Sequence, residues 1–440
     1  MKKFKKISTV FVTMLLLGTF SPLISMDTTV SAATIEQPKV EAAAAFIIEP
    51  MTGKVLLNQN GDEKLGIASM TKMITEYILL ETIKNGDLAW DDQIEISEYA
   101  HEISQNYELS NVPLRIDDTY SVEELYQAMA IYSANGATIA LAEHIAGDEK
   151  AFVDMMHEKV ESWGITNYEI YNTTGLSNFD LNGNIYPGST ENSENSMTAR
   201  GMAIIAQHLI TDFPDVLKTS SISKKTFREG TSDAIEMTNF NWMLPGLDHE
   251  RENVDGLKTG TTDFAGASMT GTAEQEGMRI ITIVMNATNG QKDLGKRFVE
   301  TDKMMDWAFE NWSKVQVFKE GQTLDNVDPA KVDKGKKDTV KLAIQSDVSL
   351  LVPTNTDSAN TETTVQLQKD LLNESGHLTA PIKKGTEVGT VQVISEGDDL
   401  GYVNGDKGEE VTVVAASTVE KANVFILAGR WMKDFISNLF

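Results

Sequence analysis

The 440-residue chain contains no cysteine, and this absence excludes several classes of protein at once. Disulfide-stapled folds, thiolate zinc sites, iron–sulfur clusters and enzymes with a cysteine nucleophile all need cysteine. The six histidines show neither the HExxH pattern nor any other paired spacing, so a histidine-based zinc hydrolase would lack its ligands. We therefore expect no metal and no other cofactor.

Positive charge is also scarce in this sequence. The 38 lysines and arginines are outnumbered by 65 aspartates and glutamates, which gives a net charge of −27. A nucleic-acid-binding protein needs a basic surface, so the charge balance argues against a nucleic-acid partner. With 41% hydrophobic and 23% charged residues, the composition is that of a folded globular protein. The length predicts two or three domains.

Residues 1–32 have the pattern of a secretory signal peptide. Lysines between Lys2 and Lys6 precede an apolar run from Ile7 to Phe20, and Val30-Ser31-Ala32 offers the small residues that a signal peptidase recognises. The alternative is an uncleaved membrane anchor, but the run is short for a membrane span and contains Thr and Gly. We expect cleavage and export, which leaves a mature chain with a net charge of −30.

Residues 418–440 predict an amphipathic helix. Large apolar side chains such as Phe425, Trp431 and Phe435 recur at helical spacing, and polar residues fill the opposite side. So many polar groups do not suit a transmembrane helix, but they suit a helix that lies among lipid headgroups. The alternative is a terminal helix that docks on the protein core. At the end of an exported chain, we favour attachment to a membrane surface.

Between these ends the chain changes character near Trp312. We expect a catalytic domain over residues 33–314 and a small β-rich domain over residues 315–417. In the first, strand-like segments alternate with helical patterns at 70–83, 122–144, 150–163, 198–209 and 295–312; a hairpin is expected over 42–58 and a buried strand over 279–286. In the second, short strands are expected at 339–344, 349–352, 387–394 and 410–415.

Ser69-Met70-Thr71-Lys72 places a hydroxyl and an amine one helical turn apart, on the same face of a helix. A desolvated lysine can have a lowered pKa and can act as the base that a serine nucleophile needs. The same spacing recurs in Ser221-Ile222-Ser223-Lys224, so the motif alone is weak. Its ordinary alternative is a helix-cap serine beside a solvated lysine.

Two further motifs follow. Ser133-Ala134-Asn135 offers a hydroxyl that could transfer a proton and an amide that could bind a peptide carbonyl, although a polar turn within a helical region is the alternative. Lys258-Thr259-Gly260 and the following Thr261 combine positive charge, hydroxyl donors for a carboxylate and a glycine that permits close approach of a substrate backbone. For this motif the alternative is a loop that enters a strand.

In this order the three motifs resemble the signature of the serine penicillin-binding proteins and class A β-lactamases. The sequence around them is similar to the low-molecular-mass D-alanyl-D-alanine carboxypeptidases at residues 67–73, 132–137 and 254–260, with further family landmarks at 172–176 and 196–200. The resemblance implies an α/β (α+β) catalytic domain of the β-lactamase/transpeptidase-like type, with a central antiparallel sheet flanked by helices. It also covers the β-rich domain and the C-terminal helix, which implies a peripheral enzyme on the outer face of the bacterial cytoplasmic membrane.

The resemblance assigns catalytic roles at matching positions. Ser69 would be the acylated nucleophile and Lys72 its general base, Ser133 would shuttle protons and Asn135 would hold the substrate backbone. The backbone amides of Ser69 and Thr261 would form the oxyanion hole. Ser69 is preferred to Ser221 because it precedes the other two motifs on a hairpin-then-helix segment.

The resemblance also assigns the pocket for the substrate's terminal carboxylate to Lys258, Thr259, Gly260 and Thr261. Many relatives have histidine at the position of Thr261, and any role of that histidine side chain would be lost here. Arg297 is a further candidate, since a guanidinium binds a carboxylate through two fixed donors, with an exposed helix-start arginine as the alternative. The nearby Gly290 to Lys296 spacing is close to a phosphate loop, but Arg297 stands where the magnesium-binding Ser or Thr is required.

The resemblance implies a serine D-alanyl-D-alanine carboxypeptidase that removes the terminal D-alanine from peptidoglycan stem peptides and is inhibited covalently by β-lactams. One alternative is a β-lactamase, which needs a loop glutamate to activate water; Glu191 and Glu194 lie in a plausible region for it. A second is a non-catalytic penicillin- or wall-binding scaffold. A third is a transpeptidase, which differs only in the acceptor. We interpret the β-rich domain as a spacer between active site and membrane.

Overall fold

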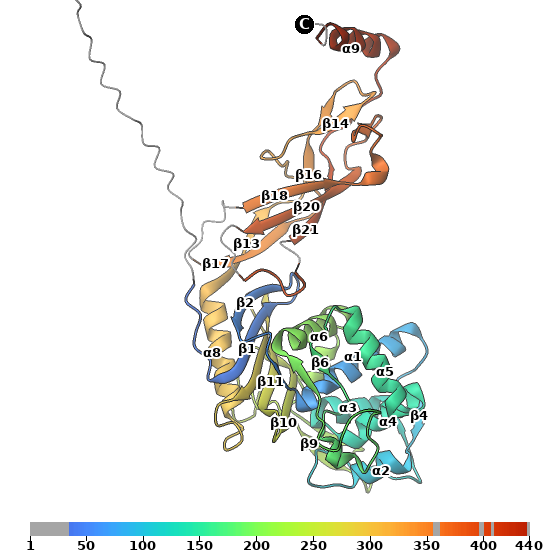
Figure 1. Cartoon of the computed structure of the whole chain (residues 1–440), viewed down its shortest axis with the longest axis vertical. Helices are drawn as coiled ribbons and strands as arrows, with labels where there is room; N and C mark the ends of the chain where they lie inside the picture. The colour runs from blue at the N-terminus through green and yellow to red at the C-terminus, as the bar shows by residue number, and fades with distance from the viewer. Residues whose placement is uncertain (1–34, 355–360, 396–399, 406–408, 438–440) are drawn as a thin grey trace, which may run out of the picture.

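A computed structural model describes residues 35–354, 361–395, 400–405 and 409–437. The proposed signal peptide, residues 1–32, lies outside the described residues. The described chain has two parts: a mixed α/β part and a β-rich part that begins at Trp312. Helix α9 lies at the end of the β-rich part that is remote from the α/β part (Figure 1).

The α/β part is built around a five-stranded antiparallel sheet with the strand order β10-β11-β12-β1-β2. Its strands are β1 Ala42–Glu49, β2 Lys54–Gln59, β10 Val254–Thr262, β11 Gly266–Gln275 and β12 Met278–Ala287. Successive side chains point to opposite faces, so Phe46 and Ile48 join one hydrophobic cluster while Ala45 and Ile47 join another. The expected antiparallel sheet, the hairpin and the buried strand over 279–286 are confirmed.

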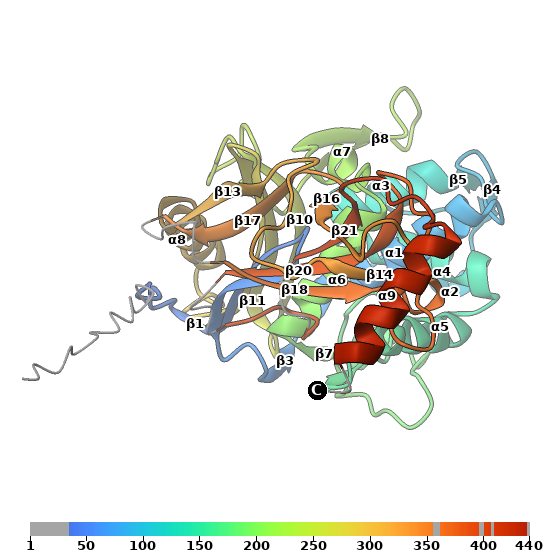
Figure 2. The ribbon, with the colours of Figure 1, turned by 90° about the horizontal axis from the view of Figure 1, so that it is seen from above.

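Helices cover both faces of this sheet. Helix α8, Lys296–Asn311, packs on one face, and helices α1, Lys72–Asn85, and α6, Ala199–Asp212, pack on the other, as Figures 1 and 2 show. Apolar residues on the inward sides of these helices meet the sheet residues in the two clusters. The sheet therefore holds the beginning of α1, the end of β10 and the beginning of α8 in fixed positions.

A second hydrophobic cluster lies among helices α2 Glu98–Ser104, α3 Val122–Tyr132, α4 Asn135–Ala146 and the end of α1. Helix α3 begins with a capping box in which Ser121 accepts a hydrogen bond from the amide of Glu124. The prediction of one helix over 122–144 is wrong. The chain breaks at Ser133, which has a φ of 56°, and a new helix begins at Asn135. The break sets Ser133 and Asn135 at the junction of two helices.

The smaller elements complete the α/β part. Helix α5 spans Glu149–Ser162 and helix α7 spans Val216–Ser220; the short strands are β3 Lys64–Gly66, β4 Gln93–Glu95, β5 Thr119–Ser121, β6 Tyr168–Glu169, β7 Ser196–Thr198, β8 Lys224–Phe227 and β9 Ile235–Thr238. Single 3-10 turns occur at Ala68–Thr71 and Asn178–Leu181. Helical predictions over 70–83, 150–163, 198–209 and 295–312 correspond to α1, α5, α6 and α8.

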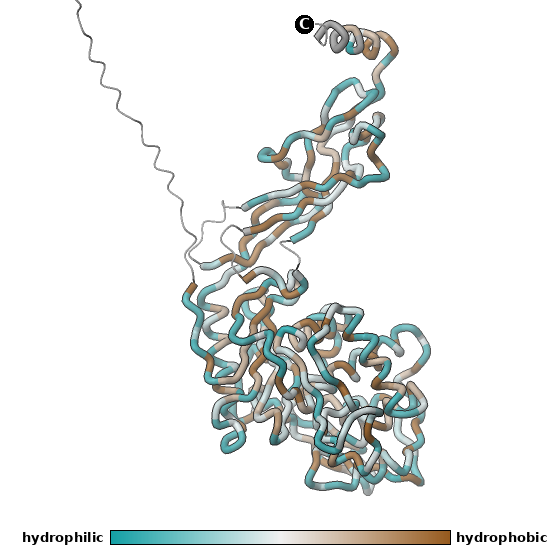
Figure 3. The backbone as a smooth tube through the Cα atoms, viewed as in Figure 1, coloured by the Kyte–Doolittle hydropathy of each residue, from teal (hydrophilic) through white to brown (hydrophobic). Residues whose placement is uncertain are grey.

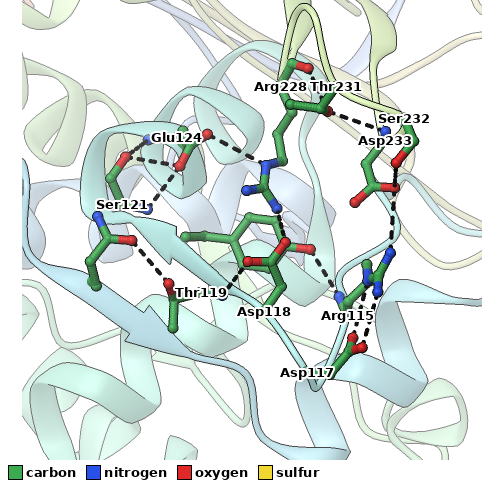
Figure 4. A network of polar contacts seen from close by, with 12 residues as sticks. Arg115, Asp117, Asp118, Thr119, Ser121, Glu124, Arg228, Thr231, Ser232 and Asp233 are labelled. Carbon is green, nitrogen blue, oxygen red and sulfur yellow. Dashed lines mark hydrogen bonds and ion pairs between the residues drawn. The ribbon is translucent and has the colours of Figure 1, made fainter.

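A network of charged side chains ties the β8–β9 hairpin to the beginning of α3 (Figure 4). Arg228 donates to the carboxylate of Asp118 at 2.5 Å and lies 4.6 Å from the ring centroid of Tyr120. A second arginine, Arg115, forms a two-donor pair with Asp117. The network anchors the hairpin beside α3, the helix that Ser133 follows.

The β-rich part contains a four-stranded sheet with the order β16-β21-β20-β18 and several smaller sheets. Its elements are β13 Trp312–Phe318, β14 Ala330–Asp333, β15 Thr339–Val340, β16 Leu342–Ile344, β17 Val348–Pro353, β18 Thr361–Leu367, the 3-10 turn Lys369–Leu371, β19 Leu378–Thr379, β20 Glu387–Ser395 and β21 Glu409–Ala415. All four expected strands are present, although the first is divided at Lys341. Figure 3 shows hydrophobic segments along the strands of both parts and polar segments in many of the connecting turns.

The two parts touch beyond their covalent link. Residues 400–405, between β20 and β21, lie against β2: the amide of Val55 donates to the carbonyl of Gly401 at 3.0 Å, and the amide of Val403 donates to the carbonyl of Gly53 at 2.8 Å. Val403 joins the hydrophobic cluster of the α/β part. The β-rich part is therefore held at two places.

The C-terminal helix α9, Val424–Ser437, begins later than the expected boundary at residue 417. Val419 is buried in the β-rich part and pairs with Ile382, so the chain leaves that part only after Ala422. From α9, Arg430 donates to the carbonyls of Gly335 and Lys336 at 2.8 and 2.9 Å. No helix within the described ranges is both long and apolar enough to cross a membrane.

Candidate active site

Ser69 lies in the 3-10 turn Ala68–Thr71 immediately before α1. Its neighbour Ala68 is buried and has a φ of 45°, a conformation that L-residues seldom adopt and that the surrounding structure must enforce. Ser69 itself is partly exposed, so its hydroxyl is open to a substrate. The turn brings the Ser69 hydroxyl within 3.0 Å of the Lys72 amine, as the spacing in the sequence suggested.

Lys72 is buried, and its amine has three hydrogen-bonding partners. The Lys72 Nζ lies 3.0 Å from Ser69 Oγ, 2.8 Å from Asn135 Oδ1 and 2.7 Å from the carbonyl oxygen of Thr174. The amide oxygen and the carbonyl oxygen can only accept, whereas a serine hydroxyl can also donate. A neutral amine therefore donates to Asn135 and Thr174 and keeps its lone pair for the proton of Ser69.

Electrostatics favour that neutral amine. Burial holds the pKa of Lys72 well below its usual range, and the positive charge of Lys258 lowers it further, while the carboxylate of Glu149 opposes both effects. A lysine with its usual pKa would be protonated at neutral pH and could not accept a proton. The environment of Lys72 thus suits a general base.

The helix break places Asn135 beside Lys72. Asn135 Oδ1 accepts from the lysine while its Nδ2 donates to the carbonyl of Ser110 at 2.9 Å, which fixes the orientation of the amide. The second N–H of this amide has no partner among the described residues. Ser133 is 4% exposed, and its hydroxyl has no hydrogen-bond partner among the described residues. An unengaged buried hydroxyl at this junction is available to pass on a proton.

Strand β10 carries Lys258, Thr259, Gly260 and Thr261 past the Ser69 turn. A Cβ atom on Gly260 would lie 2.5 Å from the carbonyl oxygen of Ile67, so only glycine permits this close packing. Lys258 is buried; burial and the charge of Arg297 lower its pKa to about 7, against the opposing effect of Glu76. The Lys258 amine therefore changes charge close to neutral pH.

Arg297, at the beginning of α8, is buried against β10 and is not an exposed helix-start residue. Its Nη1 donates to the carbonyl of Gly260 at 3.0 Å, to Thr261 Oγ1 at 2.7 Å and to the carbonyl of Ser268 at 3.3 Å. Burial lowers the pKa of the guanidinium to about 10, so it stays charged at neutral pH. Its Nε has no partner among the described residues.

Three functional groups were not predicted from the sequence. The carbonyl of Thr174 binds Lys72, and it belongs to a landmark segment for which no role was expected. The other two groups are buried carboxyl groups whose charges act on Lys72 and Lys258. Glu149 bonds to Thr173, and Glu76 accepts from the hydroxyl of Tyr126 at 2.9 Å with a pKa that burial raises to about 7. In the sequence, the only feature that could have indicated these two carboxyl groups is the presence of an acidic residue within an apolar helical pattern.

The alternative candidates lie elsewhere. Glu194 accepts from Thr262 Oγ1 at 2.6 Å, at the end of β10, and Glu191 is exposed; among the described residues neither bonds to Ser69 or Lys72. Ser221 ends helix α7, and Lys224 is exposed on strand β8, so this second Ser-x-x-Lys does not form a hydroxyl–amine pair on one helix.

Two family models match the chain. The model described as D-alanyl-D-alanine carboxypeptidase matches residues 31–289, and the model described as penicillin-binding protein 5, C-terminal domain, matches residues 312–421. Together they account for both the α/β part and the β-rich part.

Similar proteins include D-alanyl-D-alanine carboxypeptidase DacF of Bacillus subtilis, 30% identical over 90% of both chains, and DacC of Escherichia coli, 31% identical over 89% of this chain and 88% of the other. Among solved structures, a peptidoglycan synthesis regulatory factor (PBP3) of Streptococcus pneumoniae matches over 87% of this chain and all of its own, at 36% identity with a TM-score of 0.75. Penicillin-binding protein D2 of Listeria monocytogenes in its ampicillin-bound form covers 62% of this chain and all of its own, at 29% identity with a TM-score of 0.50.

Proposed function

Because the chain belongs to the D-alanyl-D-alanine carboxypeptidase family, we propose that Ser69 attacks the peptide bond between the two D-alanines that end a peptidoglycan stem peptide. The observation that carries this proposal is the contact of Ser69 Oγ with a buried lysine whose other two partners are pure acceptors. Lys72 takes the proton of Ser69 as the hydroxyl oxygen bonds to the carbonyl carbon. The lysine then has three protons and three acceptors.

The remaining steps use the neighbouring groups. The backbone amides of Ser69 and Thr261 stabilise the oxyanion, and Ser133 relays a proton to the departing D-alanine nitrogen. The C–N bond breaks, and the acyl group stays on Ser69 as an ester. Water then attacks the ester, Ser69 recovers its proton, and the shortened peptide leaves. A β-lactam acylates Ser69 by opening its ring in the same way.

The substrate's terminal carboxylate binds beside β10, where Lys258 and Arg297 bring two cationic groups together. Thr259 and Thr261 add hydroxyls, and the free N–H of Asn135 binds the substrate backbone. The assay that tests the function measures D-alanine release from a stem-peptide mimic, with and without a β-lactam. Release that a β-lactam abolishes supports a carboxypeptidase; β-lactam hydrolysis without D-alanine release would support a β-lactamase.

Carboxylate binding should weaken as pH rises through about 7. The substrate carboxylate, with a pKa of about 3.5, stays ionised, whereas Lys258 loses its charge above its pKa of about 7. The KM for a D-Ala-D-Ala peptide should rise about tenfold between pH 6 and 9, since a charge-assisted hydrogen bond contributes about 1.5–3 kcal/mol. Separate KM and kcat profiles measure this effect apart from the ionisation of Lys72.

The matched control is Lys258→Arg, whose guanidinium stays charged throughout this range. Its KM should stay nearly constant with pH, whatever its absolute value. A wild-type KM that is constant from pH 6 to 9 would contradict the assignment of Lys258 to the carboxylate pocket.

We further propose that the enzyme works outside the cytoplasmic membrane, where peptidoglycan lies, and attaches to the membrane surface through α9. Phe425 is 87% exposed and Met432 55% exposed, so these apolar side chains of α9 are uncovered. Helix α9 lies at the end of the β-rich part that is remote from the α/β part, and Ser69 belongs to the α/β part (Figure 1). The β-rich part then acts as a spacer. With a net charge near −30, the mature protein is repelled by anionic lipid, so attachment depends on apolar burial.

A mature chain that ends at Ala422 should stay in solution with phosphatidylcholine vesicles, whereas the full mature chain should sediment with them. This end point keeps Val419 in the β-rich part, and D-alanine release from small peptides should be unchanged. Phe425→Ser with Met432→Ser should release the full mature chain nearly as well, because each CH₂ withdrawn from lipid costs about 0.8 kcal/mol. The control is Lys421→Ser, which changes a charge beside the helix; equal sedimentation of all four proteins would refute the anchor.

A further inference from the structure

Glu149 is the first residue of α5, yet its side chain does not point into water. It is 7% exposed. Its Oε1 accepts from the backbone amide of Thr173 at 3.0 Å and from the hydroxyl of the same residue at 2.7 Å, and its Oε2 accepts from the hydroxyl of Tyr99 at 2.8 Å. An acidic residue at a helix start is ordinarily an exposed residue that favours the helix dipole. Three donors and near-complete burial go beyond that ordinary role.

Glu149 accepts hydrogen bonds from the same segment that binds Lys72. Thr173 directly precedes Thr174, whose carbonyl oxygen lies 2.7 Å from Lys72 Nζ. The carbonyl of Thr173 accepts from Thr75 of helix α1 at 2.9 Å, so both polar groups of this residue's backbone are fixed. The Thr174 carbonyl belongs to the second peptide unit after the one that carries the Thr173 amide, so a displaced Thr173 would shift the short stretch of backbone that presents this carbonyl to the lysine.

The rest of this turn is equally constrained. Asn172 Oδ1 accepts from the amides of Thr174 and Gly175 at 3.2 and 2.7 Å. Gly175 has a φ of +78°, and a Cβ atom there would lie 1.8 Å from the carbonyl oxygen of Ala68, the residue before Ser69. Residues 172–175 therefore pack between Glu149 on one side and the 3-10 turn that carries Ser69 on the other.

Charge connects Glu149 to Lys72 as well. The carboxylate of Glu149 raises the pKa of Lys72 against the effects of burial and Lys258, and the charge of Lys72 in turn lowers the pKa of Glu149 against burial. The other titratable groups around this carboxylate are Tyr99 of α2, Glu143 of α4 and the cap residue Asp148. Of the groups around the carboxylate, Lys72 is the one that gains positive charge during acylation.

We propose that Glu149 is a positioning residue for acylation: its carboxylate aims the Thr174 carbonyl at Lys72, and its negative charge stabilises the Lys72 ammonium that forms when Ser69 loses its proton. The inference rests on the proposed function, in which Lys72 is the base. Glu149 does not touch the substrate, and it acts through Thr173, Thr174 and the lysine.

The test measures the second-order rate of Ser69 acylation by a fluorescent penicillin between pH 5 and 9, together with the melting temperature. Glu149→Gln keeps the shape of the side chain and removes the charge. We expect acylation to slow about 10- to 100-fold, because the Lys72 ammonium that forms loses an opposite charge in a buried site, where such interactions are strong. The acid limb of the pH profile should move to lower pH, because the pKa of Lys72 falls when the opposing carboxylate is lost.

Tyr99→Phe is the matched control. It removes one donor from the same carboxylate, on the side away from Thr173, and should lower the melting temperature without moving the acid limb. If Glu149→Gln does not fold, Glu149→Asp tests the same idea, because it keeps the charge and draws the carboxylate back from Thr173. Its acylation should be slower with an unmoved acid limb, and a wild-type rate would overturn the positioning role.

A Glu149→Gln enzyme with the wild-type rate and the wild-type pH profile would overturn the proposal, whatever its melting temperature. D-alanine release by the wild-type enzyme is measured separately. An enzyme that is acylated at Ser69 but releases no D-alanine would contradict the proposed function and leave the test of Glu149 intact.

Discussion

Ser69→Ala should abolish both D-alanine release and covalent labelling by penicillin. The substitution removes the one atom that forms the acyl bond, and the partly exposed side chain has little part in core packing. Mass spectrometry after incubation with penicillin should find no adduct, while the melting temperature should stay close to that of the wild type. Activity should fall to background, since the other groups only assist an attack that no longer has a nucleophile.

Ser221→Ala is the control for this experiment, because Ser221 begins the other Ser-x-x-Lys sequence. That variant should label and turn over like the wild type. Penicillin labelling that persists in Ser69→Ala would move the acylation site elsewhere, and the double variant would then show whether Ser221 is responsible.

Lys72→Ala should slow acylation by about 10²- to 10⁴-fold, the usual contribution of a positioned general base. The nucleophile stays in place, so slow labelling should continue over long incubation, in contrast to Ser69→Ala. Stopped-flow or quench measurements of penicillin acylation give the rate. Circular dichroism should show an intact fold. The variant loses the hydrogen bonds of the Lys72 amine, but it also no longer has to bury that polar group, and the second effect offsets part of the first.

Lys72→Arg separates proton transfer from charge. A guanidinium stays protonated at every accessible pH, so this variant should be as slow as Lys72→Ala although it keeps a hydrogen-bond donor. Acylation by either variant within a few-fold of the wild-type rate would show that another group takes the proton of Ser69.

Much of the fold could be predicted because its signals are local. Strands β1, β2 and β12 of the central sheet contain apolar runs, and the helices that cover the sheet repeat apolar residues every three or four positions. The break at Ser133 could not be predicted in this way, because apolar residues continue on both sides of it. Its left-handed conformation, which glycine or asparagine usually occupies at a helix end, is imposed by the packing of α3 and α4.

In the candidate site too, local features could be predicted from the sequence and long-range contacts could not. The Ser69–Lys72 pair could be predicted because both residues lie within one helical turn. The partnership of Lys72 with Thr174 could not, since a backbone carbonyl leaves no mark on the sequence and the two residues are far apart along the chain. The burial of Arg297 also depends on a long-range contact, that between α8 and β10, and local pattern alone favoured an exposed side chain.

The contact of residues 400–405 with β2 has a consequence for self-association. Strands β2 and β10 are the two edges of the central sheet, and an open edge offers unpaired N–H and C=O groups to the strands of other molecules. The bonds from Val55 to Gly401 and from Val403 to Gly53 occupy such groups at the beginning of β2. Under the proposed function, the edge at β10 has to stay accessible to a peptide beside Ser69. The β-rich part therefore covers the beginning of one sheet edge against pairing with another molecule, and under the proposed function the other edge is the one beside which the substrate peptide binds.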